Sequence, residues 1–197
     1  MDDWLQDLAD SMAELSEKAR SSLVTVLQQG AGAGSGVLWA PGWVVTNAHV
    51  VRRGRSIVRL ANGQEATARR RGKDLQHDLA ILEVDPDLGT PAAIGDSQAL
   101  RPGEWVYAIG NPWGVPGAMT AGIVIDGHAG SGGALLALDL HLRPGHSGGA
   151  VVNARGEVVG INTMMNGPDV GLAISSAVVR RYLAEAGLGK IAFRRAA

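Results

Sequence analysis

Short apolar runs separated by turn residues are the feature that most restricts how this 197-residue chain can fold. From Val24 onward each run is too short for a stable helix and is rich in β-branched residues, which is typical of β-strands. Gly, Pro and Asn separate the runs, and Asn62-Gly63 between two of them is a strong hairpin signal. The predicted strands form two sets of six, at 24–28, 35–39, 43–47, 56–60, 65–71 and 79–84, and then at 105–109, 119–125, 134–140, 150–153, 157–164 and 170–174.

A connecting stretch rich in Pro and Gly separates the two sets at residues 85–103. Two sets of short strands joined by such a linker indicate two small antiparallel barrels. We therefore expect an all-β fold of two six-stranded antiparallel β-barrels with an N-terminal and a C-terminal helix. The expected units are an amphipathic helix at 1–23, the first barrel with its linker at 24–100, the second barrel at 101–175, and a C-terminal helix and tail at 176–197.

The first residues have the period of an amphipathic helix rather than that of a strand, which predicts a helix over 3–23. Apolar side chains recur every three or four positions, at Trp4, Leu8, Met12, Leu15, Ala19 and Leu23. Such a stripe packs on the surface of its own domain, joins copies of the chain into a trimer, or docks on a partner. Its polar face is acidic, which disfavours binding to a membrane surface.

Cysteine is absent, so disulfide scaffolds, thiol catalysis and Cys-based zinc sites are excluded. The formal net charge of −1 gives no overall field that would attract nucleic acid or an anionic membrane. The arginines within 52–55 and 69–71 are interpreted as solvated strand edges, because no aromatic residues are interleaved with them. No apolar run reaches the roughly 20 residues of a membrane-spanning helix. We expect no nucleic acid partner, no membrane span, no cofactor and no metal.

The N-terminal residues also lack the pattern of a secretory leader, since the segment from Met1 to Lys18 carries acidic residues where a leader carries basic ones. We therefore expect a cytoplasmic protein. The alternative is a periplasmic or extracytoplasmic protein from which a leader has been removed.

Three residues in the order His49, Asp78, Ser147 carry the chemistry that the sequence indicates. A serine hydroxyl is a poor nucleophile at neutral pH, so it needs an imidazole to accept its proton and a carboxylate to orient that imidazole. Gly145 lets the backbone turn so that its N–H and that of Ser147 point at one spot, an oxyanion hole for the substrate carbonyl. The sequence therefore predicts a serine protease.

The order of these residues excludes two other serine hydrolase folds. The run from Gly145 to Gly149 also fits the nucleophile elbow of α/β-hydrolases, in which the histidine follows the serine. No histidine follows Ser147, so that fold is excluded. The subtilisin order needs an acid before His49, which only the N-terminal helix supplies, and that fold is also α/β.

Further motifs make the chain similar to one family. They are Gly34-Ser35-Gly36-Val37, Val44-Val45-Thr46-Asn47-Ala48-His49-Val50-Val51, Asp78-Leu79-Ala80-Ile81-Leu82, Ile109-Gly110-Asn111-Pro112-Trp113-Gly114, Thr120-Ala121-Gly122-Ile123-Val124 and Gly156-Glu157-Val158-Val159-Gly160-Ile161-Asn162-Thr163. Over residues 22–183 the chain resembles the protease domain of HtrA/Deg proteins. The resemblance implies a trypsin-like double barrel of bacterial protein quality control that cleaves unfolded or damaged polypeptides without a cofactor. The triad would lie in the cleft between the barrels.

Three features depart from the family pattern. Members typically carry C-terminal PDZ domains, and this chain has none, so regulation by such a module requires a partner or a longer parent protein. His146 stands where many members have Asn, and it is either a buried structural residue or a pH-dependent latch on the oxyanion loop. Arg143-Pro144 replaces more typical residues before Gly145, which leaves the resting shape of that loop open.

The predicted specificity pocket is lined by the segment before Ser147 and by the last two strands. None of its candidate residues is acidic, so we expect cleavage after small or medium aliphatic residues. The backbone of 162–164 would pair with the substrate as an added strand. The candidate substrate-binding residues are His141, Leu142, Ile161, Asn162, Thr163, Met164 and Ala173. The competing interpretation is a chaperone-like or binding module with latent or weak proteolytic activity.

Overall fold

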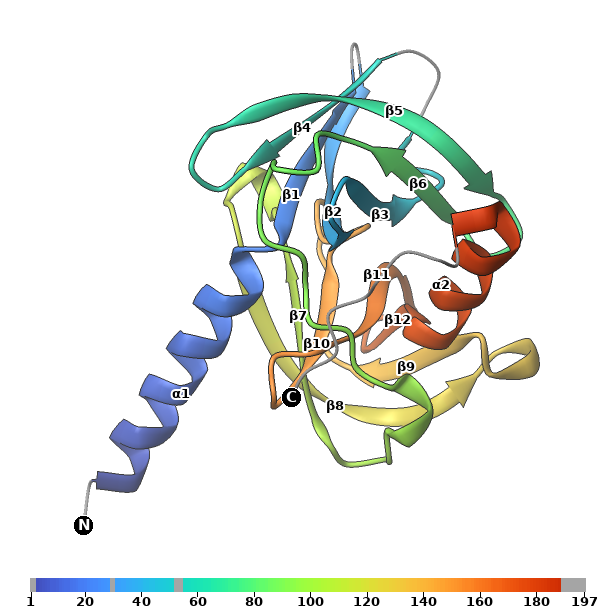
Figure 1. The fold of residues 1–197 in the computed structure, drawn as a ribbon. Coiled ribbons are helices and arrows are strands. Elements are labelled where there is room, and N and C mark those ends of the chain that lie inside the picture. Colours follow the sequence, from blue (N-terminus) through green and yellow to red (C-terminus); the bar gives the residue numbers. More distant parts are fainter. Residues whose placement is uncertain (1–2, 29–30, 52–54, 189–197) are drawn as a thin grey trace.

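Two closed barrels of antiparallel strands make up the computed structural model, which describes residues 3–28, 31–51 and 55–188 (Figure 1). Each barrel has six strands, with helix α1 before the first barrel and helix α2 after the second. The fold predicted from the strand pattern is therefore confirmed. Arg52, Arg53 and residues 189–197 of the predicted C-terminal helix and tail lie outside the described residues.

The first barrel closes in the strand order β1-β2-β3-β6-β5-β4. Its strands are β1 Leu23–Gln28, β2 Ala31–Ala40, β3 Trp43–Asn47, β4 Ser56–Leu60, β5 Glu65–Asp74 and β6 Leu79–Glu83. Asn62-Gly63 forms the expected hairpin, in which Gly63 has a φ of 87° and Arg59 pairs with Glu65 across the turn. Buried Val, Leu and Ala side chains fill the barrel.

The second barrel closes in the strand order β10-β11-β12-β9-β8-β7. Its strands are β7 Trp105–Gly110, β8 Ala118–Ala129, β9 Leu135–Asp139, β10 Ala150–Asn153, β11 Val158–Asn166 and β12 Val170–Ser175. The pairing of β11 with β10 ends at Ile161, whereas its pairing with β12 continues to Asn166. Among the described strands, the last part of β11 therefore has a partner on one edge alone.

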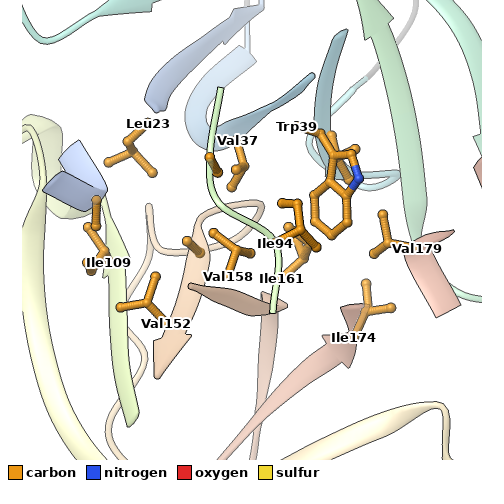
Figure 2. Close-up of a cluster of buried hydrophobic side chains, with 14 of the residues drawn as sticks. Leu23, Val37, Trp39, Ile94, Ile109, Val152, Val158, Ile161, Ile174 and Val179 are labelled. Atoms are coloured by element: carbon orange, nitrogen blue, oxygen red, sulfur yellow. The ribbon is translucent and has the colours of Figure 1, made fainter. Parts of the chain in front are cut away.

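A cluster of buried apolar side chains lies between the two barrels (Figure 2). Val37 and Trp39 come from β2, Ile109 comes from β7, and Ile161 comes from β11, and all four have an exposed fraction of 0%. Burying one aliphatic side chain of this size contributes about 1.5–3 kcal/mol. Because both barrels supply side chains, the cluster fixes how one barrel is oriented against the other.

Helix α1 covers Asp3–Arg20 and ends three residues before the predicted boundary. Leu23 is in phase with the apolar stripe of the helix, but it belongs to β1 and pairs with Val37. Leu15 and Ala19 are buried against the barrels, whereas the first turns stand away from them (Figure 1). Strand pairing thus decides where the helix ends, although the helical period continues.

The second helix, α2, covers Ser176–Leu183, and an irregular helical turn continues it over Ala184–Leu188. Ser175 caps its start by accepting a hydrogen bond from the Val178 N–H. Short 3₁₀ turns cover Ser97–Ala99, Pro112–Gly114 and Ser131–Gly133. Within the described part of the chain, no helix combines the length and apolar character needed to cross a membrane.

Candidate active site

His49 and Asp78 lie at the same end of two neighbouring strands of the first barrel. Asn47, the last residue of β3, pairs with Leu79, the first residue of β6. His49 follows this pair and Asp78 precedes it, so the ladder brings together two residues that are 29 positions apart. The His49 Nδ1 atom lies 2.7 Å from Oδ2 of Asp78, and the His49 backbone N–H donates to Oδ1 over 2.9 Å. The carboxylate therefore holds both the ring and the backbone of His49.

Asp78 also receives a hydrogen bond from the second barrel. The Thr163 hydroxyl donates to Oδ2 of Asp78 over 2.8 Å. Burial by itself raises the pKa of the Asp78 carboxyl, but the hydrogen bonds from His49 and Thr163 outweigh it, and the pKa lies below its ordinary value. The carboxylate therefore stays charged at neutral pH. Thr163 was predicted from the sequence as a backbone partner of the substrate, and its side-chain contact with Asp78 was not predicted.

Ser147 comes from the loop between β9 and β10. Its hydroxyl donates to the backbone carbonyl of Thr163 over 3.1 Å. Thr163 thus contacts Asp78 through its side chain and Ser147 through its backbone, at the irregular step that follows Asn162 in β11. The structure brings the three predicted catalytic residues to one place where the barrels meet. Among the described residues, no hydrogen bond joins Ser147 directly to His49.

The loop before Ser147 forms a tight turn over residues 143–146. The His146 N–H donates to the Arg143 carbonyl over 2.9 Å, and Gly145 has a φ of 105°. A positive φ at the third position, after proline at the second, is typical of a type II turn. Within the described part of the chain, the amides of Gly145 and Ser147 donate no hydrogen bond. Arg143-Pro144 therefore gives the loop a defined shape that leaves both of these N–H groups available.

At two positions of this loop, glycine is required by both space and backbone conformation. A Cβ atom on Gly145 would collide with the backbone of Asn111 and Pro112, and one on Gly148 would collide with the Ser35 carbonyl. Both glycines also have a positive φ, which side chains disfavour. The loop can approach the two barrels this closely only because these side chains are absent.

His146 points into the second barrel and has an exposed fraction of 1%. Its Nδ1 atom accepts the Arg143 N–H over 3.0 Å, and its Nε2 atom is buried without a described partner. Burial lowers the pKa of His146 below its ordinary value, and the positive charge of Arg143 adds to the effect, against a backbone hydrogen bond. The ring is therefore neutral at neutral pH, and protonation would replace the acceptor that binds Arg143 by a donor.

The pH dependence of stability should distinguish wild type from His146→Asn. The unfolded chain binds a proton near the ordinary His pKa of about 6.5, and the folded chain binds it only at lower pH. His146 therefore stabilises the fold above that pKa, and this contribution is lost as the pH falls through the lower folded pKa. We expect the wild type to lose stability relative to His146→Asn on acidification. Urea unfolding at several pH values measures the free energy of unfolding of both proteins, each carrying Ser147→Ala to prevent self-digestion. A difference between the two free energies that does not change with pH would contradict this prediction.

The predicted substrate-binding residues fall into two groups. Met164 is 53% exposed and His141 is also exposed, whereas Thr163 is buried beside Asp78. The remaining candidates, Leu142, Ile161, Asn162 and Ala173, are buried within or between the barrels. The backbone N–H and C=O of Asn162 are already bonded to the loop after Ser147. The exposed part of the predicted set is thus the end of β11 and the segment before the oxyanion loop.

A pocket of about 310 Å³ lies between the barrels beside Asp78 and Thr163. Gln76 and His77 line it from the first barrel, and the second barrel contributes mainly apolar side chains. These include Ala134, Leu135, Met164, Leu172 and Ile174. Of these five residues only Met164 was predicted from the sequence, because the pocket joins segments that are far apart in the chain.

Comparison with known proteins shows which family the chain is similar to. Residues 34–161 match the model of the trypsin-like peptidase domain family. The chain is 39% identical over 166 residues to the periplasmic serine endoprotease DegP of Salmonella typhimurium, covering 77% of this chain and 35% of that protein. It is 35% identical over 196 residues to the serine protease HTRA1A of Danio rerio, covering 93% of this chain and 40% of that protein.

A solved structure is also similar over most of the chain. The crystal structure of the serine endoprotease from Yersinia pestis superimposes with a TM-score of 0.80 at 30% identity, covering 88% of this chain and 65% of that chain. Against the two curated relatives named above, the chain spans 35% and 40% of their length.

The expectation of a cytoplasmic protein was wrong. DegP of Salmonella typhimurium and the periplasmic pH-dependent serine endoprotease DegQ of Escherichia coli, which is 37% identical over 165 residues, both contradict it. The acidic N-terminal residues fold as α1, so their composition reflects the exposed face of a helix.

The resemblance seen in the sequence is therefore confirmed. Barrel order, family match and similarity to the named relatives show that the chain belongs to the trypsin-like peptidases, within the HtrA/DegP group of serine proteases.

Proposed function

We propose that this chain is a serine endopeptidase that cleaves unfolded or damaged polypeptides through an acyl-enzyme. The observation that carries the proposal is the double contact of Thr163, whose hydroxyl binds Asp78 and whose carbonyl binds the Ser147 hydroxyl. Together with the 2.7 Å contact between His49 and Asp78, it supports a working nucleophile, base and carboxylate at one site.

In the proposed reaction, Ser147 Oγ attacks the carbonyl carbon of the scissile bond while its proton passes to Nε2 of His49. The Nδ1 proton stays on the ring, where the charge of Asp78 stabilises the imidazolium. The N–H groups of Gly145 and Ser147 bind the oxygen that becomes negative. His49 then protonates the leaving amine as the C–N bond breaks, and water attacks the acyl-enzyme in the same way to release the acid.

One rearrangement precedes this chemistry. The Ser147 hydroxyl rests on the Thr163 carbonyl, so it must rotate toward His49 before it can transfer its proton. Catalytic hydrogen bonds often tighten only when substrate is bound. A substrate N–H that binds the Thr163 carbonyl would displace the hydroxyl and favour this rotation.

The end of β11 is proposed to bind the substrate as an added strand. Residues 164–166 pair with β12 on one edge, and β10 does not reach them on the other. An extended chain adds to such an edge through backbone hydrogen bonds, and a folded chain offers no free strand to do so. This geometry supports unfolded polypeptides as the substrate class.

The pocket beside Asp78 supports the proposed preference for aliphatic side chains. Leu135, Leu172 and Ile174 line it, and Met164 connects it to the free edge of β11. None of the side chains from the second barrel is charged. Small or medium aliphatic residues near the scissile bond therefore fit better than Lys or Arg.

Cleavage-site mapping on a denatured protein library tests the proposal, with Ser147→Ala as the control. We expect peptide ends that require Ser147 and that are enriched in Ala, Val, Leu or Ile next to the cleaved bond. Ends enriched after Lys or Arg would contradict the proposed specificity. Ends that appear equally with Ser147→Ala would contradict the proposed chemistry.

The resting position of the Ser147 hydroxyl favours a second candidate function, a binding or chaperone-like module with weak proteolysis. A hydroxyl that stays on the Thr163 carbonyl is not activated by His49. A fluorophosphonate probe separates the two candidates, because it labels an activated serine. Rapid labelling that is lost in Ser147→Ala supports the peptidase, whereas binding of unfolded casein without labelling supports the module.

We propose that the first turns of α1 join copies of the chain, as in the predicted trimer. Trp4, Leu5 and Leu8 are 63%, 52% and 49% exposed on the part of α1 that stands away from the barrels. Replacing all three by Gln removes the apolar surface but keeps residues that favour helix. We expect this triple variant to have a lower mass by light scattering than the parent chain, and Glu14→Gln on the polar face to match the parent. Equal masses for all three proteins would contradict the proposal.

We also propose a periplasmic or other extracytoplasmic location, which the bacterial relatives support.

A further inference from the structure

Ser35 of β2 is a fully buried serine of the first barrel, and it contacts the nucleophile loop of the second. Its backbone N–H donates to the Ser147 carbonyl over 2.8 Å. Its hydroxyl donates to the Gly145 carbonyl over 2.7 Å and accepts the Asn111 N–H over 2.9 Å. One residue therefore binds the carbonyls of the two residues whose amides form the proposed oxyanion hole.

The direction of these hydrogen bonds is determined by their partners. The Asn111 N–H can only donate, so the Ser35 oxygen accepts from it and the single hydroxyl proton is left for the Gly145 carbonyl. This bond turns the Gly145 carbonyl toward the first barrel. The same peptide unit carries the His146 N–H, which then points to the Arg143 carbonyl and closes the turn.

The peptide units beside the proposed oxyanion donors are thereby held. The unit after Gly145 is bound by the Ser35 hydroxyl, and the unit after Ser147 is bound by the Ser35 N–H. The amides of Gly145 and Ser147 belong to the preceding peptide units, so Ser35 fixes the unit that directly follows each donor and restricts the backbone on that side. Oxyanion donors stabilise the transition state because they are already in place before the charge develops. Residues that fix the neighbouring peptide units therefore also affect the rate.

The chain around Ser35 allows this close approach. A Cβ atom on Gly34 would collide with Val50 and lie 3.3 Å from the Ser147 carbonyl, and one on Gly148 would collide with the Ser35 carbonyl. Thr46 donates its hydroxyl to that same carbonyl over 2.6 Å, which anchors Ser35 within its own barrel. Residues of both barrels therefore allow Ser35 to lie close to the nucleophile loop.

We propose that Ser35 is a positioning residue that holds the oxyanion loop in its active shape from the opposite barrel. The inference rests on the proposed peptidase function. Ser35 touches no reacting atom, so its effect passes through Gly145 and Ser147. The hydroxyl thus links the docking of the two barrels to the geometry of the site.

Removal of the hydroxyl should reduce turnover rather than substrate binding. Asn111 N also lies 3.2 Å from the Gly145 carbonyl, so a weaker direct contact remains in Ser35→Ala. We therefore expect kcat to fall by about tenfold to a hundredfold, less than the loss of a direct oxyanion donor, with KM nearly unchanged. Acylation by a fluorophosphonate should slow by a similar factor.

Ser56→Ala is the matched control, because Ser56 is another buried serine of the first barrel and its hydroxyl accepts from Gln28. It should keep the parent kcat. Equal losses in the two variants, or a loss that lies wholly in KM, would overturn the positioning role. A second pair of variants separates the hydroxyl from the effects of packing. Ser35→Thr and Ser35→Val introduce side chains of similar volume, but only the threonine carries a hydroxyl. Thr should be faster than Val, and equal rates would overturn the proposal.

Amide hydrogen exchange of residues 143–149 tests the same contact without turnover. Exchange in this segment should be faster in Ser35→Ala than in the wild type and in Ser56→Ala, when all carry Ser147→Ala. Unchanged exchange would contradict the inference even if the chain is active. If exchange is faster in Ser35→Ala but the parent chain shows no Ser147-dependent hydrolysis, the contact between Ser35 and the loop is supported. The proposed peptidase function is then contradicted.

Discussion

Replacement of Ser147 by alanine is expected to lower kcat by about 10⁶, or about 8 kcal/mol of transition-state stabilisation. Alanine keeps the backbone N–H that is proposed to bind the oxyanion and removes only the nucleophile. The neighbouring residues keep their contacts, because the Ser147 hydroxyl bonds only to the Thr163 carbonyl among the described groups. The measurement is the rate of hydrolysis of unfolded casein and of the peptides identified by cleavage mapping.

An exposed serine provides the control for this variant. Ser21 directly follows α1, and among the described residues its hydroxyl bonds to the Lys18 carbonyl alone, so Ser21→Ala should hydrolyse casein at the parent rate. Undiminished hydrolysis by Ser147→Ala would mean that another group is the nucleophile. It would also remove the basis for the assigned roles of His49 and Asp78.

Asp78→Asn is expected to lower kcat by about 10⁴ while the fold is retained. The Asp78 carboxylate accepts from Nδ1 of His49 and from its backbone N–H. An amide in its place can present its NH₂ group to the ring, and the ring then carries its proton on Nε2, where it cannot accept the proton of Ser147. The kcat for a mapped peptide substrate, measured at neutral pH, checks this expectation.

The chain contains a matched control for Asp78→Asn. Asp74 forms a second carboxylate–imidazole pair, with Oδ2 2.6 Å from Nδ1 of His77, only four residues before Asp78. Neither member of this pair bonds to Ser147 or Thr163 among the described contacts. Asp74→Asn should therefore keep kcat near the parent value. Equal losses in both variants would indicate general damage to this loop and would contradict a specific role for Asp78.

Much of the fold could be predicted because its signals are local. Strand alternation and turn chemistry act over a few residues, so Asn62-Gly63 and most strand boundaries could be found without tertiary information. The end of α1 could not, because the pairing of Leu23 with Val37 overrides a helical period that continues through Leu23. Helical period and strand pairing compete there, and only the folded barrel decides between them.

The candidate site was predictable to the extent that residue type and order reveal chemistry. His49, Asp78 and Ser147 stood out because their roles need those side chains in that order. The side-chain contacts of Thr163 with Asp78 and of Ser35 with Gly145 could not be predicted, because they join residues 85 and 110 positions apart. The one local signal for Ser35 is glycine on both sides, which often marks a close approach of another backbone.

By itself, the sequence determined the two sets of strands, their turns and the three chemical groups of the site, because each depends on local period or on residue type. The tertiary structure alone decided that the Ser147 hydroxyl rests on Thr163, that Thr163 binds Asp78, and that Gly145 bonds to Ser35 of the first barrel. The physical reason is that a hydrogen bond forms only within a narrow range of distance and angle. Between residues of different barrels, that range is reached only through the packing of the cluster that joins them.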